Sequence, residues 1–198
     1  MRKFVIAALL ATPMLAFAVN LVTNGSFEAN AMPSGSWAIY PTLTGWTGTP
    51  NIELRDNVAG AAFDGVNYVE LDTYSNSGMF QDIATVTGAH YNLSFAYSPR
   101  PDTGNTNDIH VLWNGALIAP LGGSNGGSTN HWTVYNFDVS GGPSDRSRLS
   151  FYAAGVSDSY GGSLDAVSLT SAVPEPQTHA LLLAGLCAVC FMGRRRKP

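Results

Sequence analysis

Six side chains in the middle of the chain could together hold a polar ligand that also has an apolar face. Five are aromatic and one is a guanidinium, and the sequence pattern places them in loops or on the outward side of strands: Trp37, Tyr40, Tyr74, Arg100, Trp132 and Tyr160. Aromatic rings cover the apolar faces of sugar rings, while amide, carboxylate and guanidinium groups bind the hydroxyls. We predict that all of them except Tyr40 contact a ligand. Each also has a plain structural explanation, since Arg100, for example, could pair with Asp102.

Catalytic signatures are weak by comparison. The sequence has no His-Glu-x-x-His pair and no phosphate-binding loop, and residues 19–172 contain no cysteine nucleophile. Glu53, Glu70 and Asp72 could supply a carboxylate pair for glycoside hydrolysis, which depends on their separation in space. They lie in strand patterns that a binding protein also has, so we expect the protein not to be an enzyme.

The first residues have the pattern of a secretory signal peptide. Arg2 and Lys3 precede an apolar run from Phe4 to Leu15, and Ala16-Phe17-Ala18 fits the small-x-small cleavage pattern. We therefore expect residues 1–18 to be a targeting segment and the folded domain to span residues 19–172, which is enough chain for one core.

The strands and loops that position the candidate residues must lie within residues 19–172, a stretch that is acidic and contains no cysteine. Residues 19–172 contain four arginines, no lysine and thirteen acidic residues, a formal net charge of −9. Such a surface argues against nucleic acid and anionic lipid as partners, because both need basic patches. Neither cysteine lies in this stretch, so no disulfide supports the fold, and three histidines without paired spacing make zinc an unsuitable metal.

Alternation with period two dominates these residues, and no helical period is evident. Between His90 and Tyr97, four large apolar side chains alternate with small or polar ones, and Gly-rich turns separate similar runs. We predict an all-β domain, an antiparallel β-sandwich of jelly-roll type. The expected strands lie at residues 51–55, 66–72, 79–84, 90–97, 107–114, 134–139, 149–153 and 164–170.

The last 26 residues combine Pro174-Glu175-Pro176, an uncharged run from Ala180 to Met192 and a basic end at residues 194–197. Thirteen residues of helix span roughly 20 Å, whereas a bilayer core is roughly 30 Å thick. One interpretation is a short permanent anchor with its arginines on the cytoplasmic side and the domain outside.

This order of parts closely resembles the PEP-CTERM sorting signal of exported proteins in Gram-negative, exopolysaccharide-producing bacteria, here over residues 173–198. The resemblance implies recognition by a membrane-embedded exosortase and cleavage near the Pro-Glu-Pro sorting motif. It also implies a transmembrane helix at 178–193 that holds the protein in the inner membrane only transiently, before release or transfer to the cell surface or extracellular matrix.

A second resemblance covers most of residues 19–172. The segments Asn20–Glu28 and Leu164–Leu169 resemble the first and last strands of galactose-binding-like β-sandwiches, the fold of many carbohydrate-binding modules. In many of these modules an acidic residue after the first strand and one on the last strand hold a structural calcium ion, which implies Glu28 and Asp165 as metal ligands, with Asp72 as a weaker candidate. The alternative is that Glu28 accepts turn amides and Asp165 is solvated.

Together these features predict a non-catalytic exported protein that binds polysaccharide in the envelope or extracellular matrix. Its expected partners are an exosortase and an exopolysaccharide, and nucleic acid is not among them. Two alternatives stay open: a structural or adhesive matrix protein without specific glycan binding, and a polysaccharide hydrolase.

Overall fold

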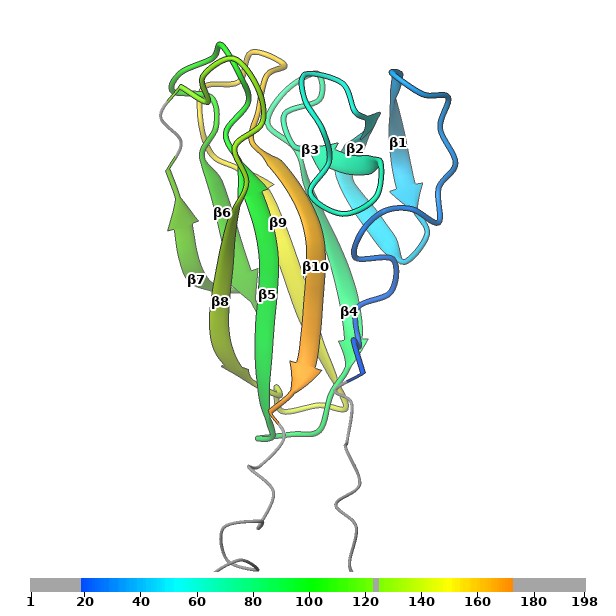
Figure 1. The fold of residues 1–198 in the computed structure, drawn as a ribbon. Helices are drawn as coiled ribbons and strands as arrows, with labels where there is room; N and C mark the ends of the chain where they lie inside the picture. Colours follow the sequence, from blue (N-terminus) through cyan, green and yellow to red (C-terminus); the bar gives the residue numbers. More distant parts are fainter. Residues whose placement is uncertain (1–18, 123–124, 173–198) are drawn as a thin grey trace, which may run out of the picture. The chain divides into compact units, whose positions relative to one another are not determined.

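The computed structural model describes residues 19–122 and 125–172, and every regular element within them is a β-strand (Figure 1). The predicted signal peptide, the Pro-Glu-Pro motif and the C-terminal apolar helix lie outside the described residues. The strands are β1 (Trp37–Leu43), β2 (Trp46–Asp56), β3 (Asn67–Glu70), β4 (Gly78–Ala84), β5 (His90–Ser98), β6 (Ile109–Trp113), β7 (Ala116–Leu121), β8 (Thr133–Ser140), β9 (Arg146–Ala153) and β10 (Ser163–Ser171).

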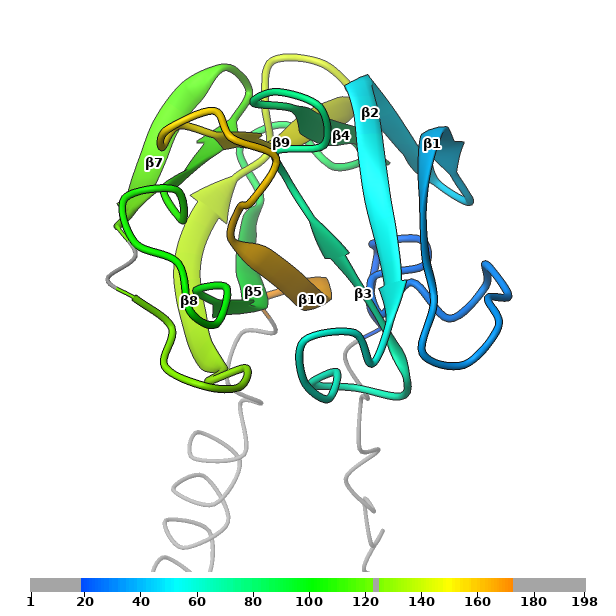
Figure 2. The same ribbon diagram turned by 90° about the horizontal axis from the view of Figure 1, so that it is seen from above.

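The strands form one antiparallel sheet that curls into two layers. Its order is β7-β6-β9-β4-β2-β3-β10-β5-β8, with β1 paired to β2 beside this path. Strand β2 joins the layers, because residues 47–49 pair with β4 while residues 53–56 pair with β3. Seen from above, β4 and β9 lie on one side and β3, β10, β5 and β8 on the other (Figure 2). The predicted antiparallel all-β sandwich is thereby confirmed.

The space between the layers is filled by the inward side chains of the alternating strands. Leu93 and Phe95 of β5 are fully buried there, as the alternation predicts. Trp46 lies at the centre, with its ring 5.9 Å from Phe27 and 6.2 Å from Phe151. Residues 19–172 form a compact unit, and this core belongs entirely to it.

The eight predicted strands correspond to observed ones, whereas β1 and β7 were not predicted. Both contain a proline, Pro41 or Pro120, and both lie at an edge of the sheet, where the missing N–H is tolerated. The ladder between β1 and β2 also shifts register between Tyr40 and Thr42. Proline and irregular pairing weaken the alternating pattern on which the prediction depended.

The opening segment, expected as the first strand, is irregular instead. Residues 19–36 contain no strand, although Leu21 donates its N–H to the carbonyl of Leu169 at 2.8 Å. The Asn20 side chain takes over part of the strand pairing, because its carbonyl oxygen accepts the N–H groups of Val22 and Leu169. A side-chain amide thus ties this segment to β10 without a regular ladder.

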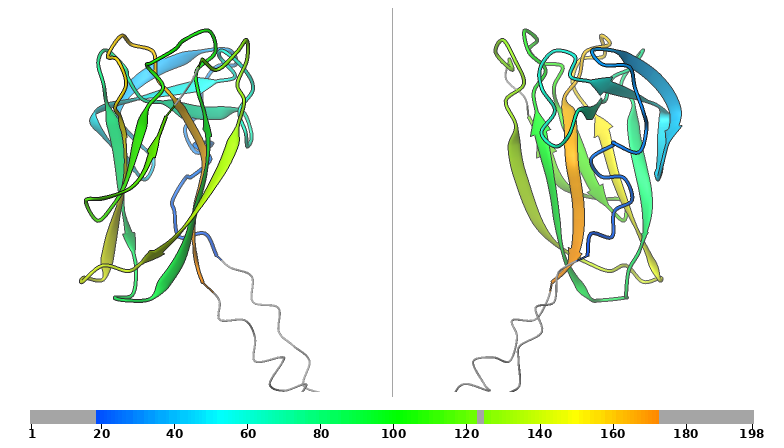
Figure 3. Two further views of the ribbon diagram at one scale, coloured as in Figure 1. Left: turned by 90° about the vertical axis from the view of Figure 1, so that its left-hand side faces the viewer. Right: turned by 45° about the vertical axis from the view of Figure 1, so that its right-hand side comes forward.

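Loops gather at one end of the two layers, the upper end in Figure 1, and Figure 3 shows the same end from two more sides. They lie between β2 and β3, β3 and β4, β5 and β6, β7 and β8, and β9 and β10. Among the described residues, no helix is long or apolar enough to cross a bilayer. The loop end covers the outer face of β2 and β3, where the charged residues of these strands lie.

Candidate functional site

The site is built on the outer face of β1, β2 and β3. Glu53 and Arg55 alternate with the core residues Ile52 and Leu54, so their side chains point away from the apolar core. Strand register places Glu70 of β3 directly opposite Glu53. These three charged residues are nonetheless buried, with exposed fractions of 4 % or less, because the loops cover them.

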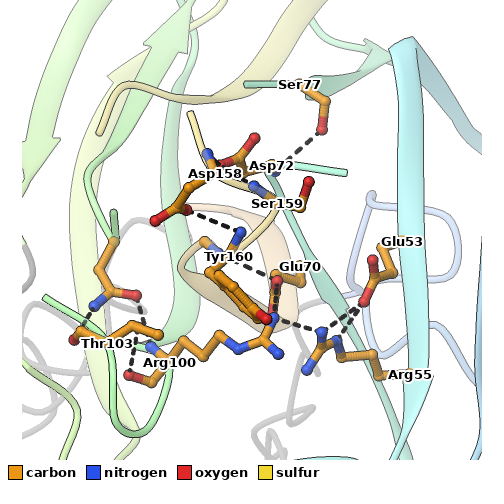
Figure 4. Close-up of polar contacts among 12 residues, drawn as sticks. Glu53, Arg55, Glu70, Asp72, Ser77, Arg100, Thr103, Asp158, Ser159 and Tyr160 are labelled. Carbon is orange, nitrogen blue, oxygen red and sulfur yellow. Dashed lines mark hydrogen bonds and ion pairs between the residues drawn. The ribbon is translucent and has the colours of Figure 1, made fainter. Parts of the chain in front are cut away.

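The buried charges form one connected network (Figure 4). The Nε and Nη2 atoms of Arg55 each lie 2.7 Å from Oε1 of Glu53, and Nη2 also lies 3.1 Å from Oε2 of Glu70. From the loop after β5, Nη1 of Arg100 reaches Oε1 of Glu70 at 2.5 Å. Arg100 therefore pairs with Glu70, one of the residues that sequence analysis considered only for hydrolysis.

Glu70 occupies the centre of this network and is fully buried. Burial raises the pKa of its carboxyl to about 7, against the opposing effect of Arg55 and Arg100, which favour the ionised form. The N–H of Gly161 also donates to Oε1 at 3.2 Å. A single carboxylate thus connects β2, β3 and the loops that follow β5 and β9.

Asp72 positions the wall of the site formed by residues 157–162. Its Oδ2 accepts the N–H groups of Asp158 at 2.8 Å and Ser159 at 3.1 Å. Asp72 has a φ of 109°, a conformation that side chains other than glycine rarely adopt. At Gly161 a Cβ atom would lie 1.6 Å from the carbonyl oxygen of Leu71, so only glycine permits this close approach.

Between these loops and β1 lies a pocket of about 410 Å³. Four of the five predicted ligand residues line it, although they come from four separate parts of the chain. The lining residues are Trp37, Ile39, Glu53, Arg55, Val58, Thr73, Tyr74, Arg100, Asp158, Ser159 and Tyr160. The fold thus brings together Trp37, Tyr74, Arg100 and Tyr160.

The pocket combines exposed aromatic rings with fixed charges. Trp37 is 56 % exposed and Tyr74 is 78 % exposed, which leaves much of their surface open to a ligand. The guanidinium carbon of Arg100 lies 4.2 Å from the ring centroid of Tyr160. Because Glu70 and Tyr160 both hold Arg100, its remaining N–H groups are preorganised to donate to an acceptor in the pocket.

Trp132, the fifth predicted ligand residue, does not line this pocket. It is half-buried, and its ring packs edge-on against Tyr68 and Phe63 at centroid distances of 5.6 and 6.3 Å. Its indole N–H donates to the carbonyl of Ala61 at 2.9 Å. These contacts hold the loop between β2 and β3, so Trp132 has a structural role in the described domain.

Glu28 and Asp165, the predicted calcium ligands, both hold the turn at residues 63–67. Oδ2 of Asp165 accepts the N–H groups of Phe63 and Asp64 at 2.8 and 2.9 Å. Oε1 of Glu28 accepts the next amides, those of Val66 and Asn67, at 2.8 and 2.6 Å. Glu28 therefore accepts turn amides as in the alternative, whereas Asp165 is fully buried rather than solvated.

The donors around this turn leave few oxygen ligands for a cation. Calcium needs six to eight oxygens with lone pairs directed at it. Here the carbonyls of Phe27 and Asn30 accept the side-chain amide of Asn67, and both oxygens of Asp165 and Oε1 of Glu28 accept backbone amides. Among the described residues, the buried Oδ1 of Asn67 has no hydrogen-bond partner. Across residues 19–122 and 125–172, no three His, Cys, Asp or Glu side chains are grouped as metal ligands. Calcium stays a prediction, and the turn has protein partners that do not require it.

Sequence reasoning did not assign several site residues to ligand binding, and three of these are the charged residues Glu53, Arg55 and Glu70. Their strands carried a usable signal, because Asn51-Ile-Glu-Leu-Arg55 and Tyr68-Val-Glu-Leu-Asp72 both alternate charged and apolar residues. Two such strands side by side would place opposite charges on one face. What the alternation does not reveal is that loops bury this face.

The fold and the pocket define the chain as a β-sandwich protein with a site between loops at one end of its layers. Residues 172–197 match the family model of the PEP-CTERM protein-sorting motif, as predicted from the Pro-Glu-Pro sequence. The chain is therefore an exported protein that carries a PEP-CTERM sorting motif. This motif lies almost entirely outside the described residues.

Sequence comparison also finds similarity between this chain and a short segment of a much larger protein. The chain is 30 % identical over 161 residues to the multifunctional-autoprocessing repeats-in-toxin of Vibrio cholerae serotype O1. The match covers 78 % of this chain and 3 % of the toxin. A second match, to the toxin of Vibrio vulnificus, also covers 3 % of that toxin. The chain thus spans about 3 % of the length of the curated relatives it matches.

Solved structures share the fold at low sequence identity. A cyclase from Fischerella sp. TAU, solved with 4-(1H-indol-3-yl)butan-2-one, has a TM-score of 0.57 at 13 % identity, covering 81 % of this chain and all of that one. A family 35 carbohydrate binding module from Clostridium thermocellum has a TM-score of 0.46 at 15 % identity, covering 69 % of this chain and 92 % of the module. At 13 % identity the likeness to the cyclase concerns the fold alone.

Proposed function

We propose that this protein is a non-catalytic exported protein that binds polysaccharide in the pocket between β1 and the loops at residues 72–77, 99–107 and 157–162. The observation that carries the proposal is the convergence of Trp37, Tyr74, Arg100 and Tyr160 on one pocket of about 410 Å³. Exposed aromatic rings provide apolar plates for sugar rings, and a fixed guanidinium provides donors for hydroxyl groups.

The proposal includes the route of the protein to its place of action. An exosortase recognises the sorting motif, cleaves near Pro174-Glu175-Pro176 and delivers residues 19–172 to the cell surface or extracellular matrix of a Gram-negative bacterium. There the pocket contacts exopolysaccharide. The acidic charge of residues 19–172 supports a sugar ligand over nucleic acid.

A binding role is favoured over hydrolysis by the state of the carboxylates. Glu53 and Glu70 lie on opposite strands, yet both are buried and both contact Arg55. A general acid or nucleophile must reach the glycosidic bond, so carboxylates that are buried and paired with an arginine are unsuited to either role. Release of reducing ends from a polysaccharide by purified residues 19–172 would contradict this part of the proposal.

Glycan binding by purified residues 19–172, which form a compact unit with their own core, tests the proposal. We expect binding to at least one oligosaccharide on a glycan array or to the exopolysaccharide of the producing strain. Tyr74→Ala should weaken that binding by about fivefold or more, because exposed aromatic contacts of this kind are worth about 1–3 kcal/mol. The matched control is Phe63→Ala, which removes an exposed ring outside the pocket.

The array result also separates the proposal from its main rival. A structural or adhesive matrix protein without a glycan site would bind no oligosaccharide at millimolar concentration. Equal losses in Tyr74→Ala and Phe63→Ala would instead show that binding occurs away from the pocket. Either outcome would overturn the assignment of the pocket as a polysaccharide site.

A further inference from the structure

The charges around the pocket decide which sugars it can accept. Two of the four arginines of residues 19–172 line the pocket, and each contacts a buried carboxylate directly. Arg55 contacts Glu53 at 2.7 Å and Glu70 at 3.1 Å, and Arg100 contacts Glu70 at 2.5 Å. Both guanidinium groups therefore already have carboxylate partners within the protein.

Two more carboxylates add negative charge that no arginine offsets. Asp158 lines the pocket and is exposed, and its Oδ1 accepts the N–H of Tyr160 at 3.1 Å. Asp72 is fully buried behind this wall. Within residues 19–122 and 125–172, neither Asp158 nor Asp72 forms an ion pair. Asp158 is therefore the most exposed charged side chain of the pocket, and it has no arginine partner among the described residues.

We propose that the pocket selects uncharged sugar units and rejects units that carry a carboxylate, such as uronates. This inference rests on the proposed function and names the ligand class of the same site. A uronate carboxylate in the pocket would be close to Asp158, and it would have to compete with Glu53 and Glu70 for the arginines. Hydroxyl groups accept from Arg100 and donate to Asp158 without either penalty.

Matched pairs of oligosaccharides test the selection directly. One pair is trigalacturonate and its fully methyl-esterified form, which have the same chain and linkage but differ in charge. The second is a mannuronate trimer and β-1,4-mannotriose. We expect the uncharged member of any pair that binds to be preferred by about tenfold or more, the effect of one unfavourable charge contact inside a partly buried site.

The outcomes separate this inference from the function on which it rests. Preference for the uronate member of a pair overturns the inference and leaves polysaccharide binding intact. If neither pair binds, the exopolysaccharide of the producing strain is compared before and after chemical reduction of its carboxyl groups. Weaker binding after reduction again overturns the inference, and no binding to either form overturns the proposed function itself.

The substitution Asp158→Asn locates the selectivity in the pocket. It keeps the oxygen that accepts the Tyr160 amide but removes the exposed negative charge, so discrimination against uronates should fall several-fold. The control is Asp138→Asn, which makes the same change of net charge at an exposed position of β8 outside the pocket. Equal effects of both substitutions would mean that overall charge controls selection, and the inference would then be wrong.

Discussion

The four arginines of residues 19–172 form two pairs in contrasting surroundings. Arg55 and Arg100 lie beneath and beside the pocket, and their partner Glu70 has no exposed surface. Arg146 and Arg148 lie on β9 in the other layer, where Arg148 binds both carboxylate oxygens of Asp82 at 2.7 Å in the open. The exposed ion pair has the better geometry, yet it is the buried network that lines a pocket.

The two pairs differ in how much their burial costs in folding free energy. Exposed ion pairs such as Arg148–Asp82 contribute about 0–1 kcal/mol, since water screens them and long side chains lose freedom. Burying ions costs several kcal/mol per group before any attraction is counted, so a core of apolar residues would be at least as stable. A buried network with Glu53, Arg55, Glu70 and Arg100 is therefore better explained by a requirement of the site than by stability.

The largest expected effect comes from removing Arg55. Arg55→Ala leaves Glu53 and Glu70 buried opposite each other without their shared cation, and the free energy of unfolding should fall by about 3–5 kcal/mol. Urea denaturation of purified residues 19–172 measures this loss. A loss below about 1 kcal/mol would mean that the buried network behaves like an exposed ion pair, and the contrast would disappear.

The next effect is the pH dependence of stability. Burial raises the pKa of Glu70 and of Asp165 to about 7, above the usual values of 4.5 and 3.8. Between about pH 4.5 and 7 the folded state therefore binds more protons than the unfolded state. Stability should decrease as pH rises through this window, by on the order of 1–3 kcal/mol for each carboxylate.

Denaturant midpoints at pH 5 and pH 8 measure this effect, and Glu70→Gln provides its control. The variant should lose the part of the pH dependence of stability that Glu70 contributes and keep the part that Asp165 contributes. A domain that is equally stable at pH 5 and pH 8 would show that both carboxyls are ionised throughout. In that case the arginines and backbone amides, rather than burial, would control the two pKa values.

The sequence predicted the sandwich and four of the eleven residues that line the pocket, but it did not predict the charged network of Glu53, Arg55, Glu70 and Arg100. Alternation in residues 90–97 shows which side chains face the core, because every second residue of a strand points the same way. Loop composition identified Trp37, Tyr74, Arg100 and Tyr160. Glu70, in contrast, occupies a position that looks solvent-facing, and only the three-dimensional arrangement of distant loops buries it.

Two further residues show the same limit. Trp132 lies in a loop, as its pattern indicated, but its ring packs against Tyr68 and Phe63. These contacts depend on which segments of the chain lie side by side in the fold. Asn20 begins a segment with a strand-like sequence, yet its side chain bonds the backbone of β10 in place of a ladder. Local pattern determines the direction of a side chain, whereas its partners depend on the register between distant segments.

A smaller effect is expected from the exposed pair. In Arg148→Ala the free energy of unfolding should fall by less than about 1 kcal/mol, because water solvates Asp82 once the guanidinium is gone. Hydrogen bonds from Arg148 lower the pKa of Asp82, so this small loss should fade only as the pH falls below the usual pKa of an aspartate. Glycan affinity should stay unchanged. A change in affinity would place part of the ligand on the β4–β9 layer.

The smallest expected effect concerns Glu28, which is exposed, and Asp165, which is buried; neither carboxylate has an arginine partner within residues 19–122 and 125–172. Backbone amides of residues 63–67 already supply hydrogen bonds to both side chains, so the predicted calcium ion should raise the melting temperature of residues 19–172 only slightly above the value with a chelator, and no rise at all would contradict the calcium prediction. An ion that binds only the folded state raises the melting temperature in proportion to the logarithm of its concentration. A rise of that form, abolished by Glu28→Gln, would establish the predicted calcium site and show that a metal supports this turn in addition to its amides.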